Sequence, residues 1–131
     1  MGNKGLKRMA KRMAKRAGIE EEAEAVGFGF SSLIAALFLG AINELPYVGE
    51  VASILLFRFH RIVLVTDEHT YVFQAKIFHR PGKLLGTYPT GPGTVDRTRG
   101  KLTFPDGQTV WHSPFFAWRM KRIQLAANTA Y

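Results

Sequence analysis

The sequence predicts an α+β protein in which helices come first and a small antiparallel β-sheet or partial barrel follows, closed by a C-terminal helix. Three observations favour this class: helically spaced apolar residues near the N-terminus, a long apolar run, and alternating β-branched segments separated by turn residues. The chain therefore divides into a basic amphipathic helix with an acidic linker (1–26), an apolar helical hairpin (27–57) and a β domain with a C-terminal helix (58–131).

The amino-acid composition favours some classes of binding partner and excludes some kinds of site. The chain has 131 residues, a formal net charge of +8 and no cysteine. The positive charge favours an anionic partner such as lipid headgroups or nucleic acid. The lack of cysteine excludes a disulfide framework, a thiolate metal site and a cysteine nucleophile, and it is compatible with a reducing cytoplasm. The apolar run begins too late for a secretory signal, so the N-terminus is expected to be retained.

Residues 4–17 predict the basic helix. Apolar residues recur there at helical spacing, and the motif Met-Ala-Lys-Arg occurs twice in succession. Five cations lie mostly off the apolar face and are candidate contacts to headgroups or phosphates: Lys7, Lys11, Arg12, Lys15 and Arg16. Such a helix can lie on an anionic membrane surface. A solvated helix or arm attached to nothing, and an arm that neutralises nucleic-acid phosphates, are the alternatives.

The segment between this helix and the apolar run is acidic. Its glutamates predict the start of a second short helix at residues 19–26, because the helix dipole favours negative charge at the N-terminus. The glycine-containing residues 27–30 lack the third glycine of a nucleotide loop and do not follow a predicted strand. We therefore expect them to turn the chain into the apolar region rather than to hold a phosphate.

The apolar run, residues 28–57, predicts two helices rather than one. A single helix would place Glu44 and Pro46 near a bilayer midplane, where an acidic residue costs roughly 2.5 to 3.5 kcal/mol. Proline would also remove a helical hydrogen bond. A hairpin that turns at residues 43–47 avoids both costs, and either lipid or protein can cover it. The expected membrane or interface contacts in it are Leu37, Phe38, Leu39, Ile54, Leu55 and Leu56.

From residue 58 the pattern becomes that of strands. Strands are predicted at residues 60–66, 70–78, 84–88, 94–104 and 108–112, with turns at 80–83, 89–93 and 105–107. The Pro-Asp-Gly turn between alternating segments is a strong hairpin signal. Ser113 and Pro114 suit the start of a helix over residues 115–127. Its apolar stripe is expected to cover one end or face of the sheet and contains Phe116, Met120, Ile123 and Ala127.

Residues 58–128 resemble bacterial pleckstrin-homology-like domains. The resemblance rests on the strand Val-Leu-Val-Thr-Asp (63–67) before Thr-Tyr-Val-Phe (70–73), the Leu-Thr-Phe-Pro-Asp-Gly hairpin and the last amphipathic helix. The whole chain is similar to small actinobacterial proteins in which a basic helix and an apolar segment precede such a domain. The resemblance implies a barrel-like scaffold that binds lipid, peptide or another subunit without catalysis. It also implies seven strands, so the missing ones are expected around residues 25–30 or from a partner chain.

Charged residues in the β domain offer one further candidate. Arg97, Arg99 and Lys101 alternate along one predicted strand and are therefore expected on one face, as a phosphate or headgroup contact or as a solvated outer surface. Among the aromatic residues at the start of the last helix, Trp118 is the candidate for an exposed interface contact, and packing under the helix is the alternative for the group.

Catalysis is not predicted. The four histidines are scattered singly over strands and turns, so no metal site is expected. Ser113 and His112 point to opposite sides of an extended chain and cannot act as a nucleophile and its base. There is no recognisable pair of catalytic carboxylates and no phosphate loop. We accordingly expect no enzymatic activity and no cofactor.

These observations predict a non-enzymatic, membrane-associated binding or scaffold protein at the cytoplasmic face of a membrane. Its expected partner is an anionic membrane surface or an integral membrane protein, with a homo- or hetero-oligomer as a further option. The alternative is a soluble subunit of a larger protein assembly, in which the apolar hairpin is buried at an interface. Nucleic-acid binding is a third, less favoured option.

Overall fold

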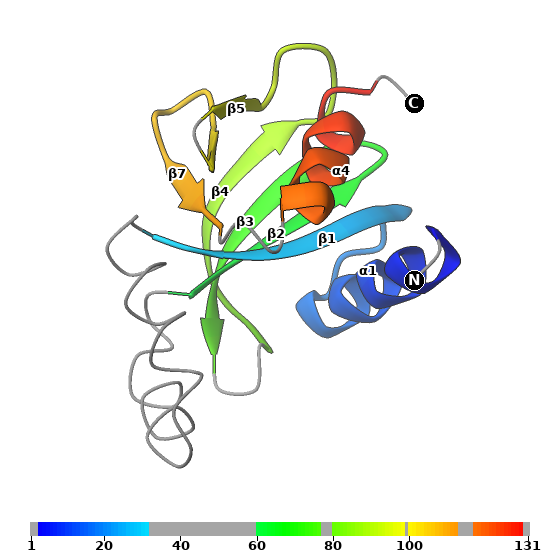
Figure 1. The fold of residues 1–131 in the computed structure, drawn as a ribbon. Helices are drawn as coiled ribbons and strands as arrows, with labels where there is room; N and C mark the ends of the chain where they lie inside the picture. The colour runs from blue at the N-terminus through cyan, green and yellow to red at the C-terminus, as the bar shows by residue number, and fades with distance from the viewer. Residues whose placement is uncertain (1–2, 32–59, 77–79, 99, 113–116, 130–131) are drawn as a thin grey trace, which may run out of the picture.

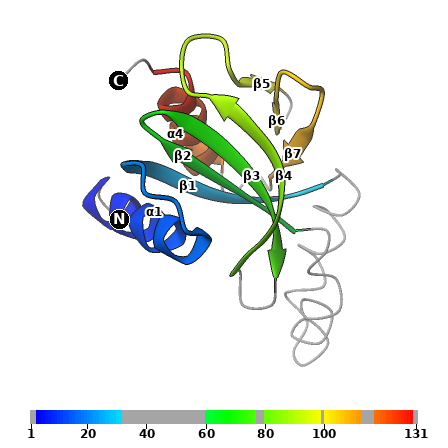
Figure 2. The same ribbon diagram turned by 180° about the vertical axis from the view of Figure 1, so that it is seen from behind.

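Seven antiparallel strands and two helices make up the part of the chain that the computed structural model describes: residues 3–31, 60–76, 80–98, 100–112 and 117–129. The elements are α1 (Asn3–Ala17), β1 (Ala23–Phe30), β2 (His60–Thr66), β3 (His69–Lys76), β4 (Arg80–Pro89), β5 (Asp96–Thr98), β6 (Lys101–Thr103), β7 (Thr109–Trp111) and α4 (Ala117–Ala127). Figures 1 and 2 show α1 and α4 on either side of β1. The predicted α+β class is confirmed.

The strands form one open sheet in the order β4-β3-β2-β1-β7-β6-β5. The first four strands follow one another along the chain, the last three do the same, and β1 joins the two groups by pairing with both β2 and β7. Strand β1 therefore lies at the centre of the sheet. The expectation that a strand comes from around residues 25–30 is confirmed.

Strand β2 is buried on both of its faces. Side chains alternate between the two faces of a strand. Accordingly, Val63 and Val65 join one apolar cluster, whereas Ile62 and Leu64 join another. All four side chains are fully buried. This burial explains why the strand has an unbroken apolar sequence, and it makes β2 the wall between two cores.

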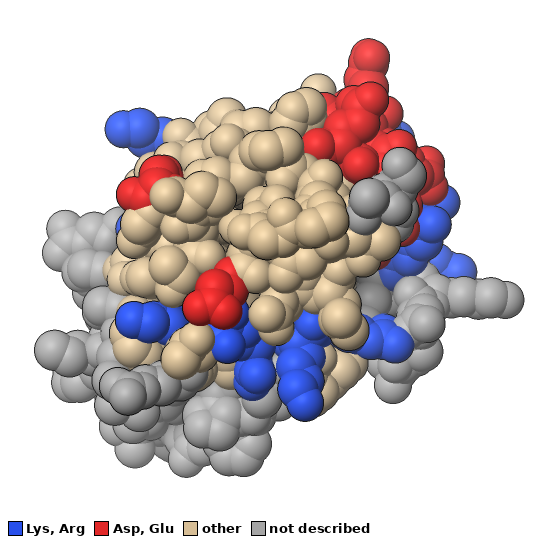
Figure 3. All heavy atoms as spheres, turned by 90° about the horizontal axis from the view of Figure 1, so that it is seen from above, with Lys and Arg blue, Asp and Glu red and all other residues tan. Residues whose placement is uncertain are grey.

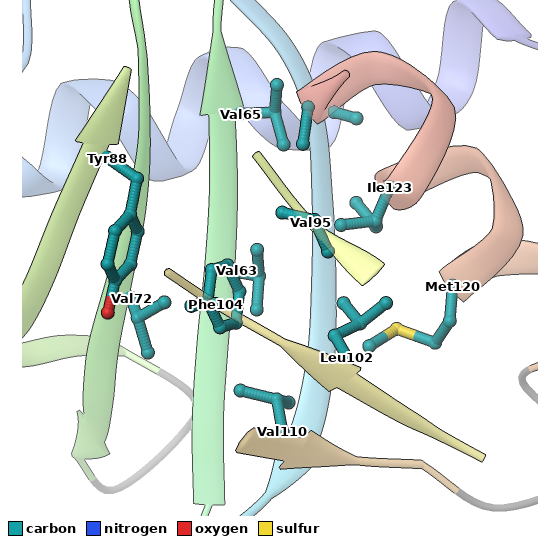
Figure 4. Packing of buried hydrophobic residues seen from close by; sticks show 12 residues of the cluster. Val63, Val65, Val72, Tyr88, Val95, Leu102, Phe104, Val110, Met120 and Ile123 are labelled. Carbon is teal, nitrogen blue, oxygen red and sulfur yellow. The ribbon is translucent and has the colours of Figure 1, made fainter. Parts of the chain in front are cut away.

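The first core lies between the sheet and α4. It contains Ala25, Val63, Val65, Val72, Tyr88, Val95, Leu102, Phe104, Val110, Met120, Ile123 and Ala127. Figure 4 shows side chains of α4, including Met120 and Ile123, beside residues of strands that are distant in the sequence. The predicted stripe is thus confirmed for Met120, Ile123 and Ala127, which are buried. Phe116 lies outside the described residues.

The second core lies under α1, on the other face of the sheet. Ala10, Met13 and Ala14 of α1 are buried against the sheet, where they meet Ala23, Val26, Ile62, Leu64, Phe73 and Ala75. The predicted helix is confirmed, and its apolar face is occupied by the protein's own strands. Only the basic face of α1 is therefore left for an outside partner.

Two features of β1 correct the sequence-based expectations. The predicted second helix at residues 19–26 is wrong, because the Ala-Glu-Ala-Val sequence pairs with β2 and alternates as a strand. The turn predicted at residues 27–30 is also wrong, since these residues continue β1. Regular alternation would put Ala23 and Ala25 on the same face of the sheet. A register shift between them instead places Ala23 in the second core and Ala25 in the first.

The glycines of β1 permit close packing. A Cβ on Gly27 would lie 2.9 Å from a side-chain carbon of Ile123 on α4. One on Gly29 would lie 2.6 Å from the backbone oxygen of Trp111 on β7. Real Cβ atoms do not approach other heavy atoms so closely. Helix α4 and strand β7 therefore reach β1 only because these positions carry no side chain.

The single strand predicted at residues 94–104 is in fact a hairpin. Strands β5 and β6 pair with each other, and Gly100 between them has a φ of 80°. The turn predicted at residues 105–107 is confirmed. The Gly107 amide donates to the carbonyl of Phe104 at 2.9 Å, and Gly107 has a φ of 90°.

The predicted apolar hairpin falls almost entirely outside the described residues. Residues 27–30 belong to β1 instead of a helix, and residues 32–59 are not described. Within the described ranges, no helix has both the length and the apolar character needed to cross a membrane.

Candidate functional site

Helix α1 presents a row of cations to solvent. With 3.6 residues per turn, the positions opposite its buried residues form one face of the helix. Five exposed side chains occupy this α1 basic face: Arg8, Lys11, Arg12, Lys15 and Arg16. Four of them were predicted as contacts. Arg8 was missed, although it precedes Arg12 by one helical turn, and that spacing is the signal that would have found it.

Lys7 lies apart from this face. Its ammonium group forms ion pairs with Glu22 at 3.7 Å and with Glu24 at 3.6 Å. Both carboxylates come from the segment that leads into β1 and from β1 itself. The structure therefore gives Lys7 two acidic partners within the domain, whereas no ion pair is found for the five cations of the α1 basic face among the described residues.

A groove separates α1 from α4. It encloses about 360 Å³ and is lined by Lys7, Glu24, Ala25, Val26, Arg119, Arg122, Ile123, Leu125, Ala126 and Thr129. Three cations and one carboxylate stand around it, and small or branched apolar residues of β1 and α4 also line it. This α1–α4 groove combines a surplus of positive charge with an apolar surface. That combination suits a ligand in which an anionic group is attached to an apolar group.

The outer face of α4 carries two exposed apolar residues. Trp118 is 48% exposed and Leu125 is 69% exposed. They are seven positions apart, so they lie on the same face of the helix, opposite the buried Met120, Ile123 and Ala127. The guanidinium carbon of Arg119 lies 5.6 Å from the Trp118 ring centroid. The predicted exposure of Trp118 is confirmed.

The cations predicted for one strand are not brought together. Arg97 lies opposite Leu102, whereas Lys101 lies opposite Thr98. Directly paired residues share a face and successive residues alternate, so Arg97 and Lys101 point to opposite faces of the hairpin. The Nζ atom of Lys101 lies 5.1 Å from the centroid of the Trp111 ring. The prediction of a common face is wrong for these two residues, because a turn interrupts the strand.

Arg99 of the same set lies outside the described residues, as do Leu37, Phe38, Leu39, Ile54, Leu55 and Leu56 of the apolar run.

Charge is distributed unevenly over the surface. Figure 3 shows acidic side chains gathered mainly at the upper right of the view, whereas most Lys and Arg side chains lie along its lower border and right-hand side. Two acidic segments distant in the sequence meet, because the Asp67 amide donates to the Glu22 carbonyl at 2.9 Å. The molecule therefore has an acidic end in addition to the α1 basic face.

Glu21 anchors this acidic end. Its carboxylate accepts hydrogen bonds from Thr66 at 2.6 Å and Tyr71 at 2.5 Å, and the Nδ1 atom of His69 lies 3.0 Å away. Glu21, Glu68 and His69 also place possible metal-ligand atoms within 4.8 Å of one another. Both oxygens of Glu21 already accept hydrogen bonds from the protein. We therefore interpret the cluster as a clasp that joins the α1–β1 connection to the turn between β2 and β3.

The clasp lowers the pKa of Glu21. Partial burial alone would raise this pKa, but hydrogen bonds from Thr66, Tyr71 and His69 together bring it below the usual glutamate value of 4.5. Burial and the nearby Glu21 carboxylate raise the pKa of Tyr71, which keeps its hydroxyl protonated as a donor. A lowered carboxyl pKa means that the ionised form stabilises the fold above that usual value, and that this contribution is lost as the pH falls through the folded-state pKa.

We expect Glu21→Gln to lower the free energy of unfolding near neutral pH by about 1 to 3 kcal/mol, because hydrogen bonds to a charged acceptor are weakened. The variant should also lose less stability than the wild type as the pH falls below 4.5. Urea denaturation at a series of pH values measures both effects. Glu20→Gln, at an exposed neighbouring position, is the control. Equal pH profiles for Glu21→Gln and the wild type would contradict the clasp.

Comparison with known protein families, with curated proteins and with solved structures finds no match for this chain.

Proposed function

We propose that the chain is a non-enzymatic binding or scaffold protein of the pleckstrin-homology-like type that associates with an anionic membrane surface at its cytoplasmic face. The α1 basic face is the observation that carries the proposal. Its five cations are exposed, whereas the apolar residues of the same helix are buried in the second core. A rigid domain thus holds a row of positive charges that has no ion pair among the described residues.

The architecture is consistent with the pleckstrin-homology-like type. Seven antiparallel strands followed by a helix is the arrangement that the resemblance implies. The sequence predicts five strands after residue 57, and a sheet of the pleckstrin-homology-like type needs two more. One is β1, and the other arises because the segment from 94 to 104 contains both β5 and β6.

The apolar run at residues 32–57 supplies the second part of the proposal. Its amino acids cannot face water without cost, so lipid or an integral membrane partner would cover them. Phe30 and His60, the described strand residues that flank the run in the sequence, are directly paired. Electrostatic attraction by α1 and apolar contact by this run would then act together.

The number of cations on the α1 basic face sets the expected size of the electrostatic contribution to membrane binding. A basic residue near an anionic membrane contributes about 1 kcal/mol. We therefore expect the triple variant Lys11→Gln, Arg12→Gln, Lys15→Gln to bind phosphatidylglycerol-containing vesicles about 100-fold more weakly than the wild type. Co-sedimentation with vesicles measures the affinity, and raising the salt concentration should weaken wild-type binding because screening shortens the range of the charges.

A triple variant with the same change in net charge is the control. Lys83→Gln, Arg97→Gln, Lys101→Gln removes three cations from β4, β5 and β6 and should retain most of the binding. Equal losses in the two variants would mean that net charge rather than the α1 basic face attracts the membrane. No binding of the wild type to anionic vesicles, together with self-association or a stable complex with another protein, would favour the alternative of a subunit in a protein assembly.

The apolar run can be removed without cutting the sheet. Because Phe30 and His60 are paired, residues 32–58 can be replaced by Asn-Gly, which makes a two-residue hairpin turn between Ser31 and Phe59. A deletion that began at residue 27 would instead remove half of β1. If the run contributes to membrane binding, the shortened protein should be released from vesicles at a lower salt concentration than the wild type.

A further inference from the structure

We propose that the α1–α4 groove binds the headgroup phosphate of an anionic phospholipid while Trp118 and Leu125 enter the interface of the same membrane. This inference rests on the proposed function and assigns a lipid-binding site to it. The groove has the charge for such a ligand, since Lys7, Arg119 and Arg122 outnumber the single carboxylate of Glu24. Because Glu24 pairs with Lys7, the Arg122 guanidinium adds positive charge that this carboxylate does not offset.

Arg122 is the best placed of these cations. It lines the groove, it is partly buried, and no carboxylate pairs with it in the described part of the chain. A guanidinium group can donate two parallel hydrogen bonds to a phosphate, whereas an ammonium group acts as a point charge. Arg119, next to the Trp118 ring, completes the cationic side of the groove.

The surface beside the groove indicates a lipid rather than a soluble phosphate. Trp118, Arg122 and Leu125 follow one another at helical spacing, so they share the outer face of α4. The two apolar members are exposed, and Leu125 also lines the groove. Tryptophan and leucine beside arginine are typical of the membrane interface, where apolar side chains enter the acyl boundary and cations meet the phosphates. A free phosphate would gain nothing from the exposed apolar residues.

Lys121 provides a matched comparison within the same helix. It is exposed and adjacent in sequence to Arg122, yet it does not line the groove. Its helical position is about 100° from that of Arg122, on the side away from the groove-lining Ala126. The decrease in affinity when the Lys121 charge is removed therefore measures general attraction to the membrane. Any larger decrease when the Arg122 charge is removed measures the contribution of the groove.

The test measures the binding of the full chain to mixed phosphatidylglycerol and phosphatidylcholine vesicles. We expect Arg122→Gln to weaken binding about tenfold more than Lys121→Gln, because a paired hydrogen-bonding contact is lost as well as a charge. Arg122→Lys should also weaken binding although it keeps the charge. Tryptophan emission should shift to shorter wavelength on binding, and Trp118→Phe should remove most of that shift while Trp111 remains.

The outcomes separate this inference from the proposed function. If the wild type does not bind anionic vesicles, the proposed function fails and the groove fails with it. If the wild type binds but Arg122→Gln and Lys121→Gln lose affinity equally, or Arg122→Lys binds like the wild type, only the groove assignment is overturned. Tighter binding of free glycerol 3-phosphate than of vesicles, lost in Arg122→Gln, would replace the lipid by a soluble phosphate ligand. Circular dichroism of each variant establishes that α4 remains folded.

Discussion

Ala10→Asp should detach α1 from the sheet and lower the free energy of unfolding by about 4 kcal/mol or more. Ala10 is fully buried in the second core, where its neighbours are apolar residues of α1 and of the strands. A carboxylate at this position would lose its hydration without gaining a partner. Chemical denaturation followed by circular dichroism measures the loss, and limited proteolysis should cut between α1 and β1 in the variant but not in the wild type.

Lys11→Asp is the matched control, because the same side chain is introduced one position later on the exposed face. It should change the free energy of unfolding by less than about 1 kcal/mol. If Ala10→Asp were as stable as Lys11→Asp, α1 would not be docked in solution. The apolar face of the helix would then be free to lie on a membrane, as the sequence pattern alone allowed.

Gly29→Ala should destabilise the protein by about 3 kcal/mol, because the added methyl group forces β1 and β7 apart. The new Cβ would lie 2.6 Å from the backbone oxygen of Trp111, and a backbone atom cannot move aside as the end of a side chain can. Thermal or urea denaturation measures the loss. The hydrogen exchange of amides in β5, β6 and β7 should also accelerate in the variant, because β7 joins these strands to β1.

Gly91→Ala is the control for the glycine substitution. It adds the same methyl group in the loop after β4, where nothing lies within 4 Å of the new carbon. We expect its effect to stay within about 0.5 kcal/mol. Wild-type stability in Gly29→Ala would show that the two strand groups do not pack as closely as the sheet order requires.

The sequence predicts most elements of this fold because their apolar residues repeat with the correct period. Ala10, Met13 and Ala14 follow helical spacing, and β2 contains four consecutive apolar residues, three of them β-branched. Strand β1 was harder to place. The glutamates before and within it favour a helix start, and its glycines suggest a turn until one knows that α4 and β7 pack against them. This information lies in Trp111 and Ile123, which are 82 positions beyond Gly29 and 96 beyond Gly27, and a local pattern does not contain it.

The candidate site was predictable only in part, for a similar reason. Helical spacing places Lys11, Arg12, Lys15 and Arg16 on one face, but it does not say that the opposite face is already occupied. The α1–α4 groove brings together residues from both ends of the chain, so no motif marks it. The alternation of Arg97 and Lys101 was misleading, because it continues through a turn that reverses the strand.

The shared wall formed by β2 has a mechanical consequence. Each core uses alternate side chains of the same four residues of β2, at positions 62–65, so loss of packing in one core weakens the strand that supports the other. In the wild type the two cores should therefore resist opening together, and detachment of α1 should require a disruptive change such as Ala10→Asp. A pull on α1 by an attached bilayer would therefore be transmitted through a single strand to the opposite helix. The two proposed contact surfaces, one on α1 and one on α4, are thereby held at a fixed spacing.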